Sequence, residues 1–235
     1  MGVQGGSITT DIIKNGLIFN MDPANRASYP KTGTLVNDTV NNNTGSLEST
    51  SFTTSGNVGI FDLDGVDDYI NFPHDSSMVI TSTWTICGWV KLNTMSGGNG
   101  YIRLIGKQDI DDWCNYGIGF QSYYRPGVIA NDGDWRTYYD GSTLNTGQWY
   151  NLTGIYNGSN YIMYIDGSLL FDQPVTLNMA NASSNTSDDP IRIGSNEGAA
   201  EFLKGNLGPI HVYNRVLSAS EVLHNYNALK GRFGL

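Results

Sequence analysis

Short segments that alternate between apolar and polar residues, separated by Asp-Gly or Asn-Gly pairs, run through most of this chain. In the clearest segment, residues 82–92, Trp84 and Ile86 fall on one face and Trp89 on the other. Both central residues of a type I′ turn need a positive φ, which Asp-Gly and Asn-Gly pairs tolerate best. The pairs lie at 64–65, 132–133, 140–141, 157–158 and 166–167. This pattern predicts an all-β protein, an antiparallel two-sheet sandwich of the jelly-roll type.

The length fits one such domain, since all-β sandwiches often reach the 235 residues found here. We expect the domain to cover residues 16–235, after a Gly-rich N-terminal arm over residues 1–15. Ile8, Ile12 and Ile13 give that arm apolar side chains with which it could anchor on neighbouring subunits.

One helix is predicted near the C-terminus, at about residues 219–230. Ser218 and Glu221 match a capping box, in which the serine hydroxyl and the glutamate each bond a free backbone N–H group. The apolar residues Val222, Tyr226 and Leu229 then fall on one helical face, and Gly231 supplies a stop. We expect the helix to pack against the sandwich.

The net charge excludes some partners. The formal charge is −9 and the isoelectric point is about 4.6, so a nucleic acid would be repelled. No basic run offers a contact for anionic lipid, and no apolar run approaches the roughly 20 residues of a membrane helix. The first residues do not match a signal peptide, so export by the usual route is not expected.

The two cysteines leave one question open. Cys87 lies among apolar neighbours and is expected to be a buried free thiol. Whether it pairs with Cys114 does not follow from the sequence.

Four aspartates lie close together in the stretch "GIFDLDGVDDYINF", namely Asp62, Asp64, Asp67 and Asp68. An EF-hand loop starting at Asp62 fails, because its fifth position is Val66 and its sixth, which must be glycine, is Asp67. We interpret the stretch as a hairpin that turns at residues 64–65. A cation role for Asp67 or Asp68 is the alternative.

Several motifs together resemble the laminin G-like, concanavalin A-like lectin/glucanase jelly rolls. "FDLDGVDDYINF" resembles their "FDG-x-x-DYV" segment, "TWTICGWVKL" their "FTISAWVK" strand, and "GNLGPIHVYNRVLSASEV" their "G-x-I-D-E-V-R-I-YNRALS-x-x-EI" ending. The first and last motifs, "GLIFNMDPANRASYP" and "YNRVLSASEVLHNYNALKGRFG", are similar to lectin-like structural proteins of tailed bacteriophages, especially marine ones. One departure is Gly208, which stands where many relatives have Asp.

Two oxygen-rich stretches near the N-terminus could form a calcium site. Asp38 matches an aspartate that recurs in the relatives. Calcium takes carboxylate and amide oxygens from loops, so one ion could draw together Asp22, Asn25, Asp38 and Asn42. The alternative is that these side chains hydrogen-bond their own backbone and hold a long loop.

The region from 113 to 139 is the most aromatic. Sugars have apolar C–H faces and a rim of hydroxyls, so a glycan site needs aromatic rings beside arginine, amides and carboxylates. The candidate glycan-binding residues are Trp113, Tyr116, Tyr123, Tyr124, Arg125, Trp135, Arg136 and Tyr138. Two alternatives remain open: some rings face the sandwich core, or they form a protein interface.

No catalytic motif was found. The glucanases of this superfamily carry Glu-x-Asp-x-Glu on one strand, and no such run occurs here. The resemblance therefore implies a non-catalytic virion surface protein on the capsid or tail, which could also adhere to glycans. Its expected location is the virion, and its expected partners are other virion proteins, further copies of itself or a cell-surface glycan. The alternatives are an extracellular, stand-alone carbohydrate-binding lectin and, less favoured, a glycoside hydrolase.

Overall fold

The computed structural model describes residues 11–56, 58–93, 100–108, 114–132, 135–177, 189–196 and 201–235, except for the side chains of residues 131 and 135. Sheet A contains β1 (Leu17–Met21), β4 (Ser51–Ser55), β5 (Val58–Asp64), β7 (Trp84–Leu92), β12 (Trp149–Tyr156), β13 (Asn160–Ile165), β14 (Ser168–Pro174) and β16 (Lys204–Tyr213). Sheet B contains β2 (Leu35–Asn37), β3 (Thr44–Glu48), β6 (Tyr69–Phe72), β8 (Ile102–Gln108), β9 (Cys114–Gln121), β10 (Arg125–Asn131), β11 (Trp135–Tyr139) and β15 (Ile191–Ile193). The short 3-10 turns are η1 (Ser76–Met78), η2 (Ser122–Tyr124) and η5 (Lys230–Phe233).

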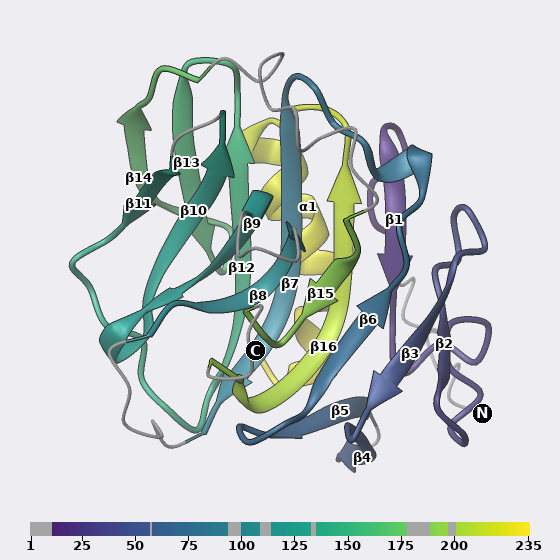
Figure 1. Ribbon diagram of the computed structural model, residues 1–235. Coiled ribbons are helices and arrows are strands. Elements are labelled where there is room, and N and C mark those ends of the chain that lie inside the picture. Colours follow the sequence, from purple (N-terminus) through teal and green to yellow (C-terminus); the bar gives the residue numbers. More distant parts are fainter. Residues whose placement is uncertain are drawn as a thin grey trace, which may run out of the picture.

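The two sheets stack face to face (Figure 1). Sheet A has the order β14-β13-β12-β7-β16-β5-β4, with β1 also paired to β16, and sheet B has the order β11-β10-β9-β8-β15-β6-β3-β2. Among the described residues, every pair of strands is antiparallel. The predicted antiparallel sandwich is therefore confirmed.

The central strand of sheet A, β7, shows how the alternating pattern is used. It pairs with β12 on one side and β16 on the other, so both of its edges are covered. Trp84 and Ile86 enter the core between the sheets, whereas Trp89 points to the outer face. This is the division of side chains that the sequence predicts.

Glycines on sheet A let the two layers approach. A methyl group at Gly88 would lie 2.8 Å from Leu104 Cδ2 on sheet B, and one at Gly154 would overlap Ile118. Both glycines lie in strands that pair with each other. The close contact of the layers therefore depends on side chains being absent at these positions.

The predicted helix is α1 (Ala219–Leu229), which covers the outer face of sheet A (Figure 1). Its capping box is present: the Glu221 N–H donates to Ser218 Oγ at 3.3 Å, and the Ser218 N–H donates to Glu221 Oε2 at 2.8 Å. Arg215 donates to both carboxylate oxygens of Glu221, at 2.6 and 3.0 Å, which holds the pKa of Glu221 at about 2. The stop is at Gly234 (φ +76°) rather than at Gly231, because η5 adds a turn after α1.

The turn after α1 brings Phe233 onto the outer face of sheet A. Its ring stacks on Trp89, with 4.3 Å between centroids, and lies 4.5 Å from Trp149. Gly208 lies directly beneath, where a Cβ atom would be 2.9 Å from both the Phe233 ring and Trp89 Cβ. Packing of Phe233 thus leaves no room for a side chain at position 208.

The chain entering β1 is bound to the same face. The Ile13 N–H donates to Asn225 Oδ1 at 2.8 Å, and Tyr213 Oη donates to the Ile13 carbonyl at 2.9 Å. Residues 11–15 of the predicted arm are therefore in contact with α1 and β16, and residues 1–10 lie outside the described residues.

The hairpin predicted at residues 64–65 is wrong. β5 belongs to sheet A and β6 to sheet B, so the turn between them crosses from one layer to the other. Phe61 and Phe72 both enter the core, but from opposite sheets. Another of the predicted turns, between β13 and β14, has the expected geometry. Its two central residues, Asp166 (φ +53°) and Gly167 (φ +77°), both have a positive φ.

Asp38 fixes the loop between β2 and β3. Its side chain is fully buried. Its Oδ1 accepts the N–H groups of Asn20 and Val40, each at 2.9 Å, and its Oδ2 accepts the Asn41 N–H at 3.0 Å. One carboxylate therefore closes the loop and ties it to β1.

We expect Gly208→Ala to lower the free energy of unfolding by about 1–3 kcal/mol, because overpacking forces Phe233 or Trp89 to move. Urea unfolding followed by fluorescence measures this change. Gly231→Ala is the matched control, since nothing lies within 4 Å of a Cβ atom there. Equal stability of the two variants would contradict the packing account.

We expect Asp38→Asn to lower the free energy of unfolding by about 1–3 kcal/mol, because an amide N–H would face the Asn41 N–H inside the protein. Asp67→Asn is the control, since Asp67 is exposed and accepts from Ser49 Oγ at 3.0 Å. Urea denaturation of both variants tests this, and a loss no greater than that of the control would show that the loop does not depend on the carboxylate.

Candidate functional site

Two of the predicted glycan-binding tyrosines lie in the core. Tyr116 is fully buried, and its hydroxyl donates to the Met78 carbonyl at 2.7 Å. Tyr124 is 3% exposed and packs edge-on against Phe120. Alternate side chains of β9 face the core, and Tyr116 is one of them. Neither tyrosine ring is therefore accessible to a ligand from solvent. Trp113 and the side chain of Trp135 lie outside the described residues.

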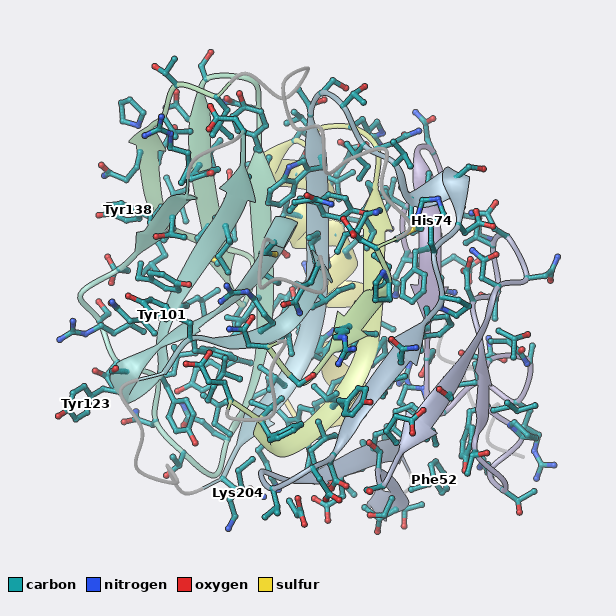
Figure 2. All side chains as sticks on the ribbon, in the orientation of Figure 1. Phe52, His74, Tyr101, Tyr123, Tyr138 and Lys204 are labelled. Carbon is teal, nitrogen blue, oxygen red and sulfur yellow. The ribbon has the colours of Figure 1, made fainter. Side chains whose placement is uncertain are left out.

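The other predicted residues divide into two places. Tyr123 is 60% exposed in η2 and has a φ of +65°, and the half-buried Arg125 follows shortly after it. Arg136 and Tyr138 come from β11, the edge strand of sheet B. Figure 2 shows Tyr138 on the side of the molecule where β11 and β14 lie, with Tyr123 further along the same side.

A hollow of about 310 Å³ opens where the edge of sheet B meets the edge of sheet A. We call it the rim hollow. It is lined by Arg136, Thr137, Tyr138, Tyr161, Gln173, Pro174 and Val175. A second hollow of about 350 Å³ shares Pro174 and Val175 with it and continues to Ser159 and Leu177.

Contacts between the sheets fix the shape of the rim hollow. Tyr161 Oη of β13 donates to the Arg136 carbonyl of β11 at 2.9 Å. The Tyr138 ring lies 4.6 Å from the Phe171 ring of β14, at an interplanar angle of 64°. The Arg136 side chain is further held by Asp132, with Nε and Oδ1 3.5 Å apart. The opening therefore presents the Arg136 guanidinium, the Gln173 amide and the half-buried Tyr138 ring, while the buried Tyr161 braces the two strands.

Tyr161 and Gln173 were not predicted as site residues. They lie more than 20 positions from Arg136, on a different sheet, and only cross-sheet packing joins them. The alternation of "NYIMYIDG" predicts that Tyr161 and Met163 share a face, but it does not identify the strand that this face meets.

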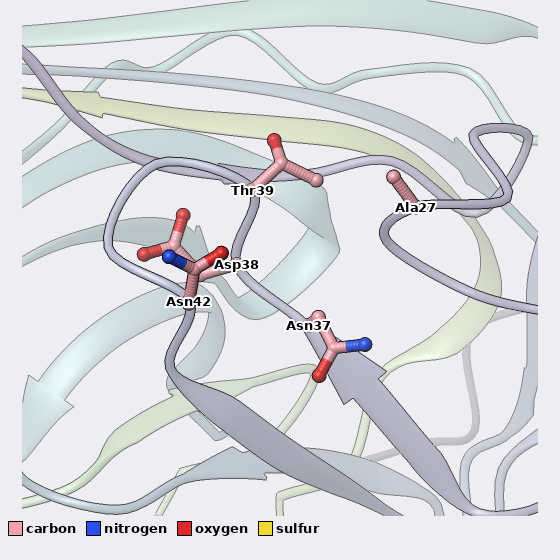
Figure 3. Close-up of a pocket in the computed structure, with 5 residues that line it drawn as sticks. All are labelled: Ala27, Asn37, Asp38, Thr39 and Asn42. Atoms are coloured by element: carbon pink, nitrogen blue, oxygen red, sulfur yellow. The ribbon is translucent and has the colours of Figure 1, made fainter.

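The four residues of the predicted calcium site do not come together as a set. Asp38 and Asn42 line one hollow with Ala27, Asn37 and Thr39 (Figure 3). Asp22 instead pairs with Arg232 through both oxygens, at 2.8 and 2.9 Å, and lines a different hollow. Asn25 Oδ1 accepts the Ala27 N–H at 3.0 Å. The side-chain oxygens of Asp22, Asn25 and Asp38 thus accept bonds from backbone N–H groups and an arginine, which fits the loop-holding alternative, and calcium binding stays a prediction.

The aspartate cluster has a structural account too. The carboxylates of Asp64, Asp67 and Asp68 each offer an oxygen within 4.8 Å of the others. Asp68 is 5% exposed and accepts the Asp64 N–H at 2.7 Å, and its burial raises its pKa. Asp64 Oδ1 accepts the Val66 N–H at 2.7 Å. These bonds hold the crossing between the two sheets, and the cation role stays a hypothesis.

Two thiols and a histidine are also buried. Cys87 and Cys114 are both free and buried, and burial raises the pKa of Cys87 to about 11. Burial lowers the pKa of His211 to about 4, so its ring is neutral near pH 7. None of the described helices is long and apolar enough to span a membrane.

Solved structures share this fold at low sequence identity. The binding domain of Paraclostridial Mosquitocidal Protein 1 matches with a TM-score of 0.71 and 14% identity, over 91% of this chain and 52% of that one. The chain thus spans about half the length of that binding domain. Domain 4 of AbnA, an extracellular arabinanase from Geobacillus stearothermophilus solved with arabinotriose, matches with a TM-score of 0.66 and 17% identity, over 89% of this chain and 98% of that one. The receptor binding domain of botulinum neurotoxin C/D mosaic serotype matches with a TM-score of 0.68 and 14% identity, over 92% of this chain and 52% of that one.

At these identities the likeness shows the fold alone. A comparison with curated protein sequences found no match. Residues 64–223 match the family model described as the concanavalin A-like lectin/glucanases superfamily, which is more than half of the sequence. The chain therefore belongs to that superfamily.

Proposed function

We propose that this protein is a non-catalytic surface protein of a tailed-phage virion and that it binds glycans through the rim hollow. The observation that carries the glycan part is the set of side chains at one opening: the Arg136 guanidinium, the Gln173 amide and the Tyr138 ring. They lie on a sandwich of a lectin superfamily.

These groups suit a sugar. Arginine offers several N–H donors, and glutamine can donate and accept, so both can bond hydroxyl groups. Tyr138 adds an aromatic surface beside them. Asp132 and Tyr161 hold Arg136, and the Phe171 ring packs against Tyr138, so these two residues need little ordering on binding. The second hollow beyond Pro174 leaves room for a longer chain of sugars.

Comparison with domain 4 of AbnA supports this proposal, since that domain was solved with arabinotriose. The proposed absence of catalysis is supported by the lack of a Glu-x-Asp-x-Glu run. Among the described residues, Asp132 lies beside the rim hollow and pairs with Arg136.

The virion part rests on the resemblance of the first and last motifs to lectin-like structural proteins of tailed phages. Other virion proteins and further copies of this chain are the proposed partners, and the virion is the proposed location. A stand-alone, extracellular lectin is the competing proposal. Measuring the protein in purified phage particles, as described below, distinguishes it from the virion role.

We expect Arg136→Ala and Gln173→Ala each to weaken glycan binding about tenfold or more, because a lost hydrogen bond to a charged or buried polar group is worth about 1–3 kcal/mol. The purified chain is first screened on an array of bacterial, plant and animal glycans that includes arabinotriose, and affinities are then measured by calorimetry. Arg26→Ala removes the same charge from an exposed loop far along the chain and serves as the control.

Tyr123→Ala tests the other predicted location. If it abolishes binding while Arg136→Ala and Gln173→Ala do not, the glycan site lies at η2 and the rim hollow is excluded. If no glycan on the array binds, the glycan part of the proposal is rejected.

We expect the protein in purified phage particles in fixed stoichiometry to the capsid or tail proteins, because a decorating protein occupies symmetry-related positions. Quantitative mass spectrometry of gradient-purified particles measures the copy number. Its presence in the soluble fraction alone would reject the virion role and favour the stand-alone lectin.

A further inference from the structure

A lysine is fully buried inside the sandwich. Lys107 lies in β8, opposite Tyr116 of β9 and Ile191 of β15. Residues directly opposite in paired strands share a face, and both neighbours belong to the core. The Lys107 side chain therefore points inward, and its exposed fraction is 0%.

The Lys107 amine faces a buried carboxylate. Its Nζ atom lies 3.8 Å from Oδ2 of Asp189, whose side chain is 5% exposed. A buried ion pair gains little net stability, because both charges are taken out of water. The carbohydrate-binding role leaves this pair unexplained.

A bulge brings an asparagine to the same carboxylate oxygen. The register of β8 and β9 changes from Lys107–Tyr116 to Gln108–Cys114, so Asn115 is an extra residue on β9. β-Bulges re-aim side chains, and here Asn115 Nδ2 donates to Asp189 Oδ2 at 2.7 Å. Asn115 is fully buried. One oxygen of Asp189 therefore lies against both the lysine amine and the asparagine amide.

The surroundings exclude water. Tyr116, beside Lys107, is fully buried, and burial raises its pKa. An amine attacks only when uncharged, and the Asp189 carboxylate 3.8 Å from Nζ is placed to take its proton. A buried amine, a buried amide and a carboxylate between them form the set needed for acyl transfer within the chain.

The geometry points to an intramolecular isopeptide bond between Lys107 and Asn115, formed with Asp189 as proton relay. Lys107 Nζ attacks Cγ of Asn115, so an N–C bond forms and the Cγ–Nδ2 bond breaks. Asp189 Oδ2 takes a proton from Nζ and delivers one to Nδ2, which leaves as ammonia. No oxidant, metal or cofactor enters this balance, and an amide replaces the buried amine.

Intact-mass spectrometry of the purified full chain tests this. We expect the wild type to be lighter than its sequence by one ammonia molecule. Asp189→Asn keeps the size of the relay but removes its proton transfer, and Lys107→Met removes the nucleophile, so both are expected at full sequence mass. Lys91→Met removes a lysine of β7 and should keep the loss of ammonia.

Tryptic peptides locate the bond. A linked Lys107 blocks cleavage after it, so a single peptide over residues 104–136 is expected, because trypsin does not cut between Arg125 and Pro126. A cyclic imide at an asparagine also loses ammonia but leaves cleavage after Lys107 intact, and this result would overturn the proposal. Full sequence mass in the folded wild type would overturn it too, as would loss of water, which would place the bond at Asp189.

Discussion

The close approach of the two sheets is the constraint on which the rest of the structure depends. It is possible because Gly88 and Gly154 leave room on sheet A for Leu104 and Ile118 of sheet B. With the layers in contact, their edge strands meet at the rim hollow, where Tyr161 of one sheet bonds the backbone of the other. Lys107 points into the same packed interior, and both it and Asn115 are fully buried. A candidate binding site at the edge and a reactive cluster inside thus follow from one packing relation.

Local patterns in the sequence predicted the features that depend on neighbours along the chain. The alternation of residues 82–92 gave β7 and the faces of its tryptophans, and Ser218 with Glu221 gave the start of α1. Features that depend on the other sheet were missed. A turn at residues 64–65 looks the same whether it closes a hairpin or crosses between layers, and only the pairing of β5 with β16 and of β6 with β15 decides the matter.

The candidate site was predicted only in part for the same reason. Arg136 and Tyr138 were identified by composition, but Tyr161 and Gln173 join them from the opposite sheet. Tyr116 was expected to reach solvent and instead fills the core. Lys107 could not be identified at all, because a lysine inside an alternating strand is expected to face water. Its position follows from the irregularity between Arg103 and Ile105 of β8, which shifts the alternation by a residue before Lys107 is reached.

The contact of residues 11–15 with the end of the chain has a mechanical consequence. β1 and β16 are antiparallel, and Leu17 at the start of β1 pairs with Tyr213 at the end of β16. The N-terminal and C-terminal segments of the chain therefore extend from the same end of this ladder. A tensile force applied between those two segments would therefore load the ladder one rung at a time, as a zipper is opened, rather than in shear. β1 would peel away at low force while the two-layer core stayed intact, so the molecule would be compliant at its ends and stiff in its body.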